Sequence, residues 1–197
     1  MTRILALVVV LLAGCESKPK GRATPRDAFA RLATCVDRAD RTCLYRELDR
    51  DSRWSIQTIH RTLVEMRGLV TSSYPEERRD GAYGIWGAEA QTESPGELFD
   101  VFCRERSCLT RLARGFGAVA EVVPRDDGRV TVVTTRGARF ELADRDGEWG
   151  LSTWCDELQA AKIHLGDALE QVRRNARAFE QQRRAVGDAG GMGKEGT

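Results

Sequence analysis

The sequence carries almost no net charge, and this near-balance excludes one broad class of partner. Its 197 residues carry 31 Lys and Arg against 30 Asp and Glu, so the chain has no overall field that would attract nucleic acid. Hydrophobic residues at 41% and charged residues at 31% are typical of a soluble globular domain. We therefore expect one folded domain and no nucleic-acid partner.

The sequence also has only two histidines and no motif of a common catalytic, nucleotide or metal site. The patterns G-x-S-x-G, H-E-x-x-H and the P-loop are missing, and the six cysteines include no C-x-x-C. Because no histidine lies near the cysteine pairs, a metal site is not expected. Residues 115–120 fit G-x-G-x-x-A, but a strand is expected after them, where a dinucleotide site requires a helix. We predict no cofactor, no metal and no catalytic residue defined by a motif.

Long apolar runs are absent, and the one clear run stands at the start of the chain. Met1 to Arg3 is a minimal positive segment, and residues 4–13 after it are all apolar. Ten apolar residues are too few to cross ~30 Å of hydrocarbon as a helix. The run is therefore typical of a cleaved signal peptide.

Residues 12–15 read Leu-Ala-Gly-Cys and resemble the lipobox of bacterial lipoproteins. The resemblance implies that the chain is cut before Cys15, that the Cys15 thiol is diacylated and that the new amino terminus is acylated. Several acyl chains make such attachment effectively permanent. The enteric sorting rule treats Asp directly after the lipidated Cys as a signal for retention in the inner membrane. Here that position holds Glu16 instead. The implied partner is thus a membrane, and the implied location is the cell envelope, with the periplasmic face of the outer membrane favoured over the inner membrane.

The whole chain divides by composition and period into five segments. Residues 1–14 form the signal peptide, 15–23 a lipidated tether and 24–155 the folded domain. An amphipathic helix is expected over 156–186 and a disordered Gly-rich tail over 187–197. Loss of the signal removes one basic residue, so the mature chain is formally neutral.

Within the folded domain, helices are expected first and strands second. Thr24-Pro25 and Ser94-Pro95 are typical helix starts, with a capping hydroxyl before a proline. From residue 118 the apolar period changes from helical to two. The four strands are expected over 118–123, 129–135, 138–143 and 148–154. Their links are short, so neighbouring strands must be antiparallel. N-terminal helices that cover one face of this four-stranded meander make a two-layer α+β fold.

This order of elements resembles the NTF2-like (SnoaL-like, cystatin-like) cone fold. Residues 25–49 look like that family's first two helices, and residues 146–151, Asp-Gly-Glu-Trp-Gly-Leu, look like its terminal strand. The resemblance covers residues 24–155 and implies a curved sheet around a cavity, in which enzymes of this fold place an acid, a His or a Tyr. The first strand usual after the second helix is not visible here, and the long C-terminal helix is additional.

One candidate pocket follows from the helix that begins near Asp51. His60 lies at the edge of the apolar face of this helix, between Ile56 and Leu63, and Trp54 and Tyr45 are nearby in the sequence. A histidine in this position can line a pocket and act as a base. It can equally be a hydrogen-bonded residue at the border of the core.

Five cysteines remain after the lipidated one, in a compartment expected to be oxidising. Cys35 ends the first helix and Cys43 begins the second, so a bridge between them would staple a helical hairpin. Cys103 and Cys108 could close a small loop, which would leave Cys155 free. A Cys103–Cys155 or Cys108–Cys155 bridge is an alternative, because sequence alone does not fix connectivity.

The C-terminal helix carries an apolar residue at every seventh position, which is typical of a coiled-coil seam. The series consists of Leu158, Leu165, Val172, Phe179 and Val186, with weaker companions at Ala161, Ala168, Asn175 and Gln182. The first half of the helix is expected to pack on the domain and the second half to project. A homodimer through residues 156–186 is a further expectation.

The leading hypothesis is a lipid-anchored envelope protein with a non-catalytic role in binding or assembly. Its partner would be an envelope protein or a small-molecule ligand. One alternative is a small-molecule enzyme of the cone type that uses His60 as base. The other is an oligomeric envelope scaffold joined through the C-terminal helix.

Replacing Cys15 with Ser tests the anchor. Without the thiol, a diacylglyceryl group cannot be joined to residue 15 through a thioether. We therefore expect Cys15→Ser to abolish palmitate labelling and to move the chain out of the membrane fraction. Cys155→Ser is the control and should label like the parent chain. Unchanged membrane fractionation of Cys15→Ser would disprove lipid anchoring.

Overall fold

The computed structural model describes residues 23–191 and confirms the α+β fold. Cys15, with the rest of residues 1–22, and residues 192–197 lie outside the described residues. The α-helices are α1 (Pro25–Asp37), α2 (Arg41–Arg46), α3 (Arg50–Ser73), α4 (Pro95–Glu105), α5 (Cys108–Gly115) and α6 (Cys155–Gly191). Three short 3₁₀ helices follow α3: η1 (Glu76–Arg78), η2 (Asp80–Trp86) and η3 (Glu89–Gln91). The strands are β1 (Val119–Pro124), β2 (Arg129–Thr134), β3 (Arg139–Arg145) and β4 (Glu148–Leu151).

The first three helices begin where polar side chains cap their amino ends. Thr24 caps α1, Asp40 caps α2 and Asp49 caps α3, and each accepts a backbone N–H from three residues further on. With Asp49 as cap, α3 starts at Arg50, slightly before the predicted start. It ends at Ser73, because Tyr74 precedes a proline and takes an extended conformation.

The sheet is the predicted meander, with strand order β1-β2-β3-β4 and antiparallel neighbours throughout. Gly128 and Gly137 both take φ of +76° in the hairpin turns, which explains glycine at these positions. Alternate residues of β2 and β3 face the core, and Val132 and Leu142 are fully buried. The helices therefore cover one face of the sheet and leave the other to solvent.

An aromatic cluster fills the space between α1 and the sheet. The ring of Phe29 from α1 lies 4.8 Å from that of Phe116 and 5.3 Å from that of Phe140, measured between centroids. Phe116 and Phe140 are themselves 4.8 Å apart. We call the sheet with α1 and α5 the head of the molecule.

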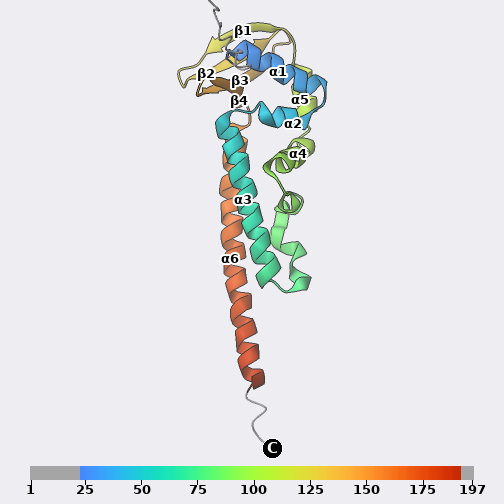
Figure 1. Ribbon diagram of the computed structural model, residues 1–197, viewed down its shortest axis with the longest axis vertical. Helices are drawn as coiled ribbons and strands as arrows, with labels where there is room; N and C mark the ends of the chain where they lie inside the picture. Colours follow the sequence, from blue (N-terminus) through green and yellow to red (C-terminus); the bar gives the residue numbers. More distant parts are fainter. Residues whose placement is uncertain (1–22, 192–197) are drawn as a thin grey trace, which may run out of the picture.

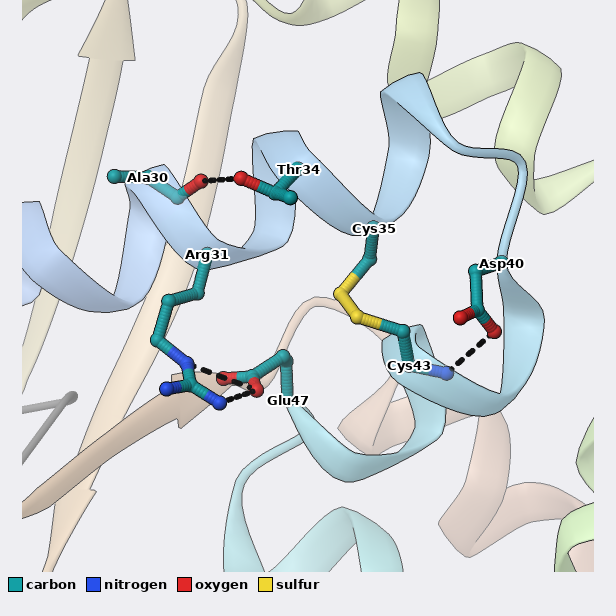
Figure 2. The surroundings of a disulfide bond; sticks show 7 residues. All are labelled: Ala30, Arg31, Thr34, Cys35, Asp40, Cys43 and Glu47. Atoms are coloured by element: carbon teal, nitrogen blue, oxygen red, sulfur yellow. Dashed lines mark hydrogen bonds and ion pairs between the residues drawn. A yellow bond between two sulfur atoms is a disulfide. The ribbon is translucent and has the colours of Figure 1, made fainter.

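A disulfide between Cys35 and Cys43 joins α1 to α2 beside the head (Figure 2). Arg31 of α1 adds a second link to the end of α2. Its guanidinium donates to Oε1 of Glu47, the buried residue directly after α2, at 2.8 and 3.1 Å. Of the cysteine pairings left open by the sequence, the structure contains this one.

The two longest helices lie side by side and form what we call the stalk, α3 with α6 (Figure 1). They run parallel, because Ser55 contacts Gln159 near their starts and Ser73 contacts Glu180 near the end of α3. Both start at the edge of the sheet, and the carboxyl end of α6 extends beyond that of α3 (Figure 1). At 1.5 Å per residue, α3 is about 36 Å long and α6 about 55 Å.

The predicted seam of the C-terminal helix packs inside the molecule. Leu158, Leu165 and Val172 are 0–3% exposed, and the hydroxyl of Tyr74 donates to the carbonyl of Val172 at 3.2 Å. Contacts with α3 continue to Phe179, whose ring meets that of Tyr74 edge-on at 4.9 Å. The seam is therefore occupied by α3 as far as Phe179. The helix also continues to Gly191, past the predicted boundary at residue 186.

The start of α3 is joined to the end of β4 by a single parallel bridge, which holds the stalk to the head. The N–H of Leu151 donates to the carbonyl of Glu47 at 2.9 Å, and the N–H of Asp49 donates to the carbonyl of Leu151 at 3.0 Å. Gly150 lies against this junction, and a Cβ there would come within 2.6 Å of the backbone of Asp49. Only glycine fits without displacing one of the two segments.

Substitution of Gly150 tests how much stability this close approach provides. We expect Gly150→Ala to lower the free energy of unfolding by about 1–3 kcal/mol, because backbone atoms must move to accept the methyl group. Gly166→Ala is the matched control. Gly166 is exposed on α6, and no atom lies within 4 Å of a Cβ placed there. The substitution should therefore raise the free energy of unfolding by about 0.5–1 kcal/mol. Urea denaturation measures both, and equal effects would contradict the tight junction.

Candidate functional site

An open, largely apolar hollow beside the stalk lies between η2 and α6. It has a volume of about 560 Å³ and presents more apolar than polar surface. Its η2 side is formed by residues 81–86, and its α6 side by His164, Ala168, Gln171, Val172 and Asn175. Its polar side-chain groups belong to Tyr83, Trp86, His164, Gln171 and Asn175, and no Asp, Glu, Lys or Arg lines it. Such a mixture of apolar surface and a few polar groups is typical of a binding site.

The conformation of η2 decides which side chains face this hollow. Gly84 has φ of +55°, a left-handed conformation that breaks the helical path between Tyr83 and Ile85. Tyr83 and Trp86 are half-buried against the core, whereas Ile85 is 85% exposed. Ile85 therefore presents an apolar side chain to solvent at the edge of the apolar hollow.

Trp86 separates the outer hollow from a small inner cavity. The inner cavity is also lined by Ile56, Phe99 and the carboxylate residue Glu89, and its volume of about 20 Å³ is close to that needed for one water. Glu89 is 7% exposed, and burial raises the pKa of its carboxyl group, while the charge of Arg106 opposes that shift. The inner cavity is too small for an organic ligand, so only the outer hollow offers binding space at this point.

The three residues predicted to share a pocket each have different neighbours. Tyr45 packs on Phe99 with ring centroids 5.7 Å apart. Trp54 is 55% exposed, and the ammonium group of Lys162 lies 4.5 Å from its ring centroid. These two aromatic residues are therefore not brought together.

His60 lies at the border of the core, as one of its two predicted roles requires. Its Nε2 is 3.3 Å from the carbonyl oxygen of Thr92. It is the eleventh residue of α3, so it stands about 15 Å along the stalk from the sheet. A role as base inside a cone would require it under the sheet, where the rings of Phe29 and Phe140 pack.

The remaining cysteines lie in two places. Cys103 of α4 and Cys108 of α5 are buried as free thiols. The interaction between the two thiols lowers the pKa of Cys103 and raises the pKa of Cys108. Cys155, at the start of α6, is half-exposed.

The start of α6 is an unusual environment for a thiol. A helix amino end normally lowers the pKa of cysteine. Here burial raises the pKa of Cys155, and the carboxylates of Asp49, Asp156 and Asp51 act in the same direction against the charge of Arg129. Asp49 is itself 4% exposed, and burial raises the pKa of its carboxyl group despite its bonds to Ser52.

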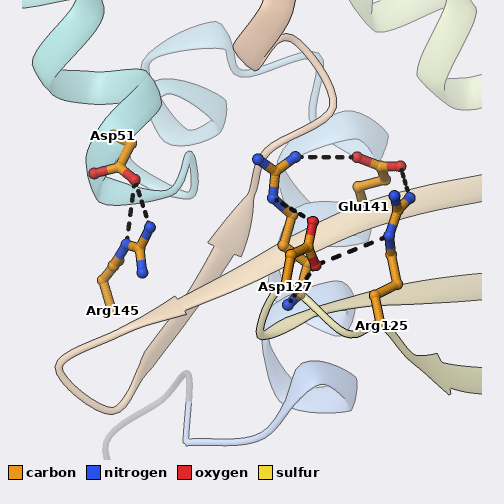
Figure 3. A network of polar contacts seen from close by, with 6 residues as sticks. Asp51, Arg125, Asp127, Glu141 and Arg145 are labelled. Carbon is orange, nitrogen blue, oxygen red and sulfur yellow. Dashed lines mark hydrogen bonds and ion pairs between the residues drawn. The ribbon is translucent and has the colours of Figure 1, made fainter.

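The outer face of the sheet carries a network of alternating charges (Figure 3). Arg125 bonds Glu141 at 2.5 Å, and Arg129 contacts both Asp127 at 3.4 Å and Glu141 at 3.6 Å. These side chains are about one-third to one-half exposed, so each pair contributes about 0–1 kcal/mol. The network balances its own charges and attracts neither an anion nor a cation specifically.

No group of three or more His, Cys, Asp or Glu side chains among residues 23–191 is placed to hold a metal ion. None of the helices in the described part of the chain is both long and apolar enough to cross a membrane. Comparison of the chain with family models, with curated proteins and with solved structures finds no match.

Sequence reasoning missed the hollow because residues 75–93 show no regular period. One signal was present: Gly81, Gly84 and Gly87 enclose a short stretch with Tyr83, Ile85 and Trp86. Glycines that interrupt a segment rich in large apolar residues indicate a turn that exposes them. The α6 side of the hollow includes Ala168 and Asn175, which were identified only as weak companions of the seam.

Alkylation of Cys155 in the native chain tests the environment of α6's amino end. Because its pKa is raised, we expect the rate to reach half its maximum above the ordinary thiol value of about pH 8.5. Asp49→Asn keeps the helix cap and removes one charge, so it should shift that midpoint to lower pH. The buried Cys103 and Cys108 should not react in the native chain.

Three results would contradict this account. They are a Cys155 midpoint at or below about pH 8.5, no change in Asp49→Asn, and native protection of Cys155 with alkylation only after reduction. The last result would instead establish a bridge from Cys155 to Cys103 or Cys108.

Proposed function

We propose that this chain is a lipid-anchored protein of the bacterial cell envelope with a non-catalytic role in binding or assembly. The observation that carries the proposal is the direction of the stalk. The described chain begins at the head, and α3 and α6 both extend away from it to the opposite end of the molecule (Figure 1). An anchor at Cys15 would therefore attach the head to the membrane and present the stalk.

The length of the tether supports this arrangement. Residues 15–23 can reach about 30 Å at most when fully extended. The stalk is longer, because α6 alone measures about 55 Å. The head would thus stay near the bilayer, while the far end of α6 could stand well away from it.

The chemistry of the hollow supports a binding role. Aromatic residues are enriched at protein interfaces, and charged residues are depleted at their centres. Tyr83 and Trp86 with the exposed Ile85 provide the apolar part, and Gln171 and Asn175 provide neutral hydrogen-bonding groups. Such a surface suits a protein partner better than a charged metabolite.

The cysteines support an extracytoplasmic location. The Cys35–Cys43 disulfide is of a kind that persists in oxidising compartments such as the periplasm. The adjacent thiols of Cys103 and Cys108 would form a second bridge there. By the resemblance at Cys15 and Glu16, the periplasmic face of the outer membrane is the proposed site.

The cone-type enzyme stays a prediction. It rested on His60 as base, and the ring of His60 lies against the carbonyl of Thr92 on the stalk. No observation in the structure favours it over a binding role, so we do not propose it.

Energy transfer to the membrane surface tests the orientation. The lipidated full chain would carry a donor fluorophore at Glu121 in the head or at Gln181 near the far end of α6, in vesicles with acceptor-labelled headgroups. Both positions are exposed. We expect markedly stronger transfer from Glu121, because the head is held near the bilayer. Cys15→Ser is the control and should show no transfer from either position. Equal or stronger transfer from Gln181 in the lipidated chain would overturn the proposal.

A further inference from the structure

Four arginines gather at one end of the head, around the carboxyl end of α5. They are Arg26 of α1, Arg111 and Arg114 of α5, and Arg136 of the turn between β2 and β3, and all four side chains are exposed. Arg111 and Arg114 are three residues apart and therefore share one side of α5. Nη1 of Arg136 donates to the carbonyls of Ala113 and Arg114 at 3.3 and 3.4 Å, which holds Arg136 against the end of α5. We call these four residues the arginine cluster.

The start of α1 belongs to the same end of the head. The ring of Phe29 lies 4.8 Å from that of Phe116, the residue directly after α5, and 5.3 Å from that of Phe140. Arg26 stands three residues before Phe29, so the two lie on one side of α1. Helices α1 and α5 also pack against each other (Figure 1). The arginine cluster therefore lies beside the point at which the described chain enters the head.

The arginine cluster has few carboxylates near it in the sequence and pairs with none. Residues 108–120 and residues 130–140 contain no Asp or Glu. Among residues 23–191, the ion pairs are made by other arginines, and none of the four lies within 4 Å of a carboxylate. Asp27, the neighbour of Arg26, accepts from the hydroxyl of Thr24 at 2.7 Å instead. A chain with almost no net charge thus carries uncompensated positive charge at this one end.

The position of the arginine cluster selects an anionic bilayer as its partner. The tether of residues 15–23 reaches about 30 Å at most, and Phe29 lies only about 6 Å along α1 from Pro25. A head held this close turns the surface around its entry point toward the membrane. Basic residues near a membrane surface attract anionic phospholipids, over a Debye length of about 8 Å at physiological salt. The far end of the stalk lies outside that range.

We propose that the arginine cluster docks the head on the anionic phospholipids of the membrane that holds the anchor. The inference deepens the proposed lipid anchoring and rests on it. The tether by itself limits only the distance between head and bilayer, whereas the cluster also fixes which side of the head faces the lipid. The stalk then points away from the membrane. Each arginine near an anionic surface strengthens such binding about fivefold.

Photo-cross-linking to lipid tests the contact. The lipidated full chain would carry a photoreactive residue at position 113, which is exposed between Arg111 and Arg114, in vesicles of phosphatidylcholine and phosphatidylglycerol. We expect protein–phospholipid adducts there, and at least about tenfold fewer in vesicles of phosphatidylcholine alone, because those vesicles lack the negative surface charge. Salt at about 1 M shortens the Debye length to about 3 Å and should have the same effect. A photoreactive residue at position 181, near the far end of α6, should give no adducts.

Two double variants test the arginines themselves. Arg111→Gln with Arg114→Gln removes two adjacent charges, and we expect at least about tenfold fewer adducts from position 113. Arg174→Gln with Arg177→Gln is the matched control. It removes two arginines at the same spacing from exposed positions of α6 and should have no effect. If the α5 variant fails to fold, Arg26→Gln on α1 tests the same cluster, with an expected fall of about fivefold.

Each other outcome counts against the contact. Equal adduct yields in phosphatidylcholine vesicles, or an unchanged yield in the α5 variant, would mean that the tether alone brings position 113 to the bilayer, and would overturn the proposal. In cells, links from position 113 to an acidic protein in place of lipid would overturn the choice of partner. The anchor is separable. A chain that labels with palmitate and floats with the vesicles but gives no adducts defeats only the contact, whereas a chain that does not associate with vesicles defeats the anchor as well.

Discussion

Two backbone hydrogen bonds between the segment before α3 and Leu151 of β4 fix the position of the long helices. They join parts of the chain about a hundred residues apart and place the start of α3 against the last strand of the sheet. Because α6 begins four residues after Leu151, it starts at the same place and must run beside α3 in the same direction. The close approach is open only to glycine at position 150, where any Cβ would meet the backbone of Asp49.

The parallel pair decides which surface of α6 is left for other molecules. Its most apolar face is covered by α3, and Trp154 secures the start of the helix by packing with Phe99 and Phe102 at 6.0 and 6.4 Å between centroids. The η2 segment then lies against the adjoining side. Between η2 and α6 the apolar hollow remains, with His164, Gln171 and Asn175 on its α6 side. The proposed binding role follows from this division of α6 into a face covered by α3 and a side that borders the hollow.

The junction also explains why two groups with raised pKa values, Asp49 and Cys155, lie at one end of the stalk. Asp49 caps α3, and its carboxylate is buried where the amino ends of both long helices meet. Burial raises the pKa of Asp49. Burial of the Cys155 thiol, together with the charge of Asp49, raises the pKa of Cys155. A favourable helix cap and an unfavourable desolvation therefore act on the same carboxyl group.

The sequence by itself determined the elements that depend on neighbouring residues. The caps at Thr24 and Ser94, the glycine turns of the meander and the α+β class could all be read from short patterns, because capping and hairpin formation involve residues a few positions apart. The Cys35–Cys43 bridge belonged to the same group, since it spans eight residues, although other pairings stayed open. Only the tertiary structure decided the parallel direction of α3 and α6, the conformation of η2 and the separation of Tyr45, Trp54 and His60. Those features depend on contacts such as Leu48 with Leu151, which leave no periodic signal in the sequence because each partner looks locally like any other core residue.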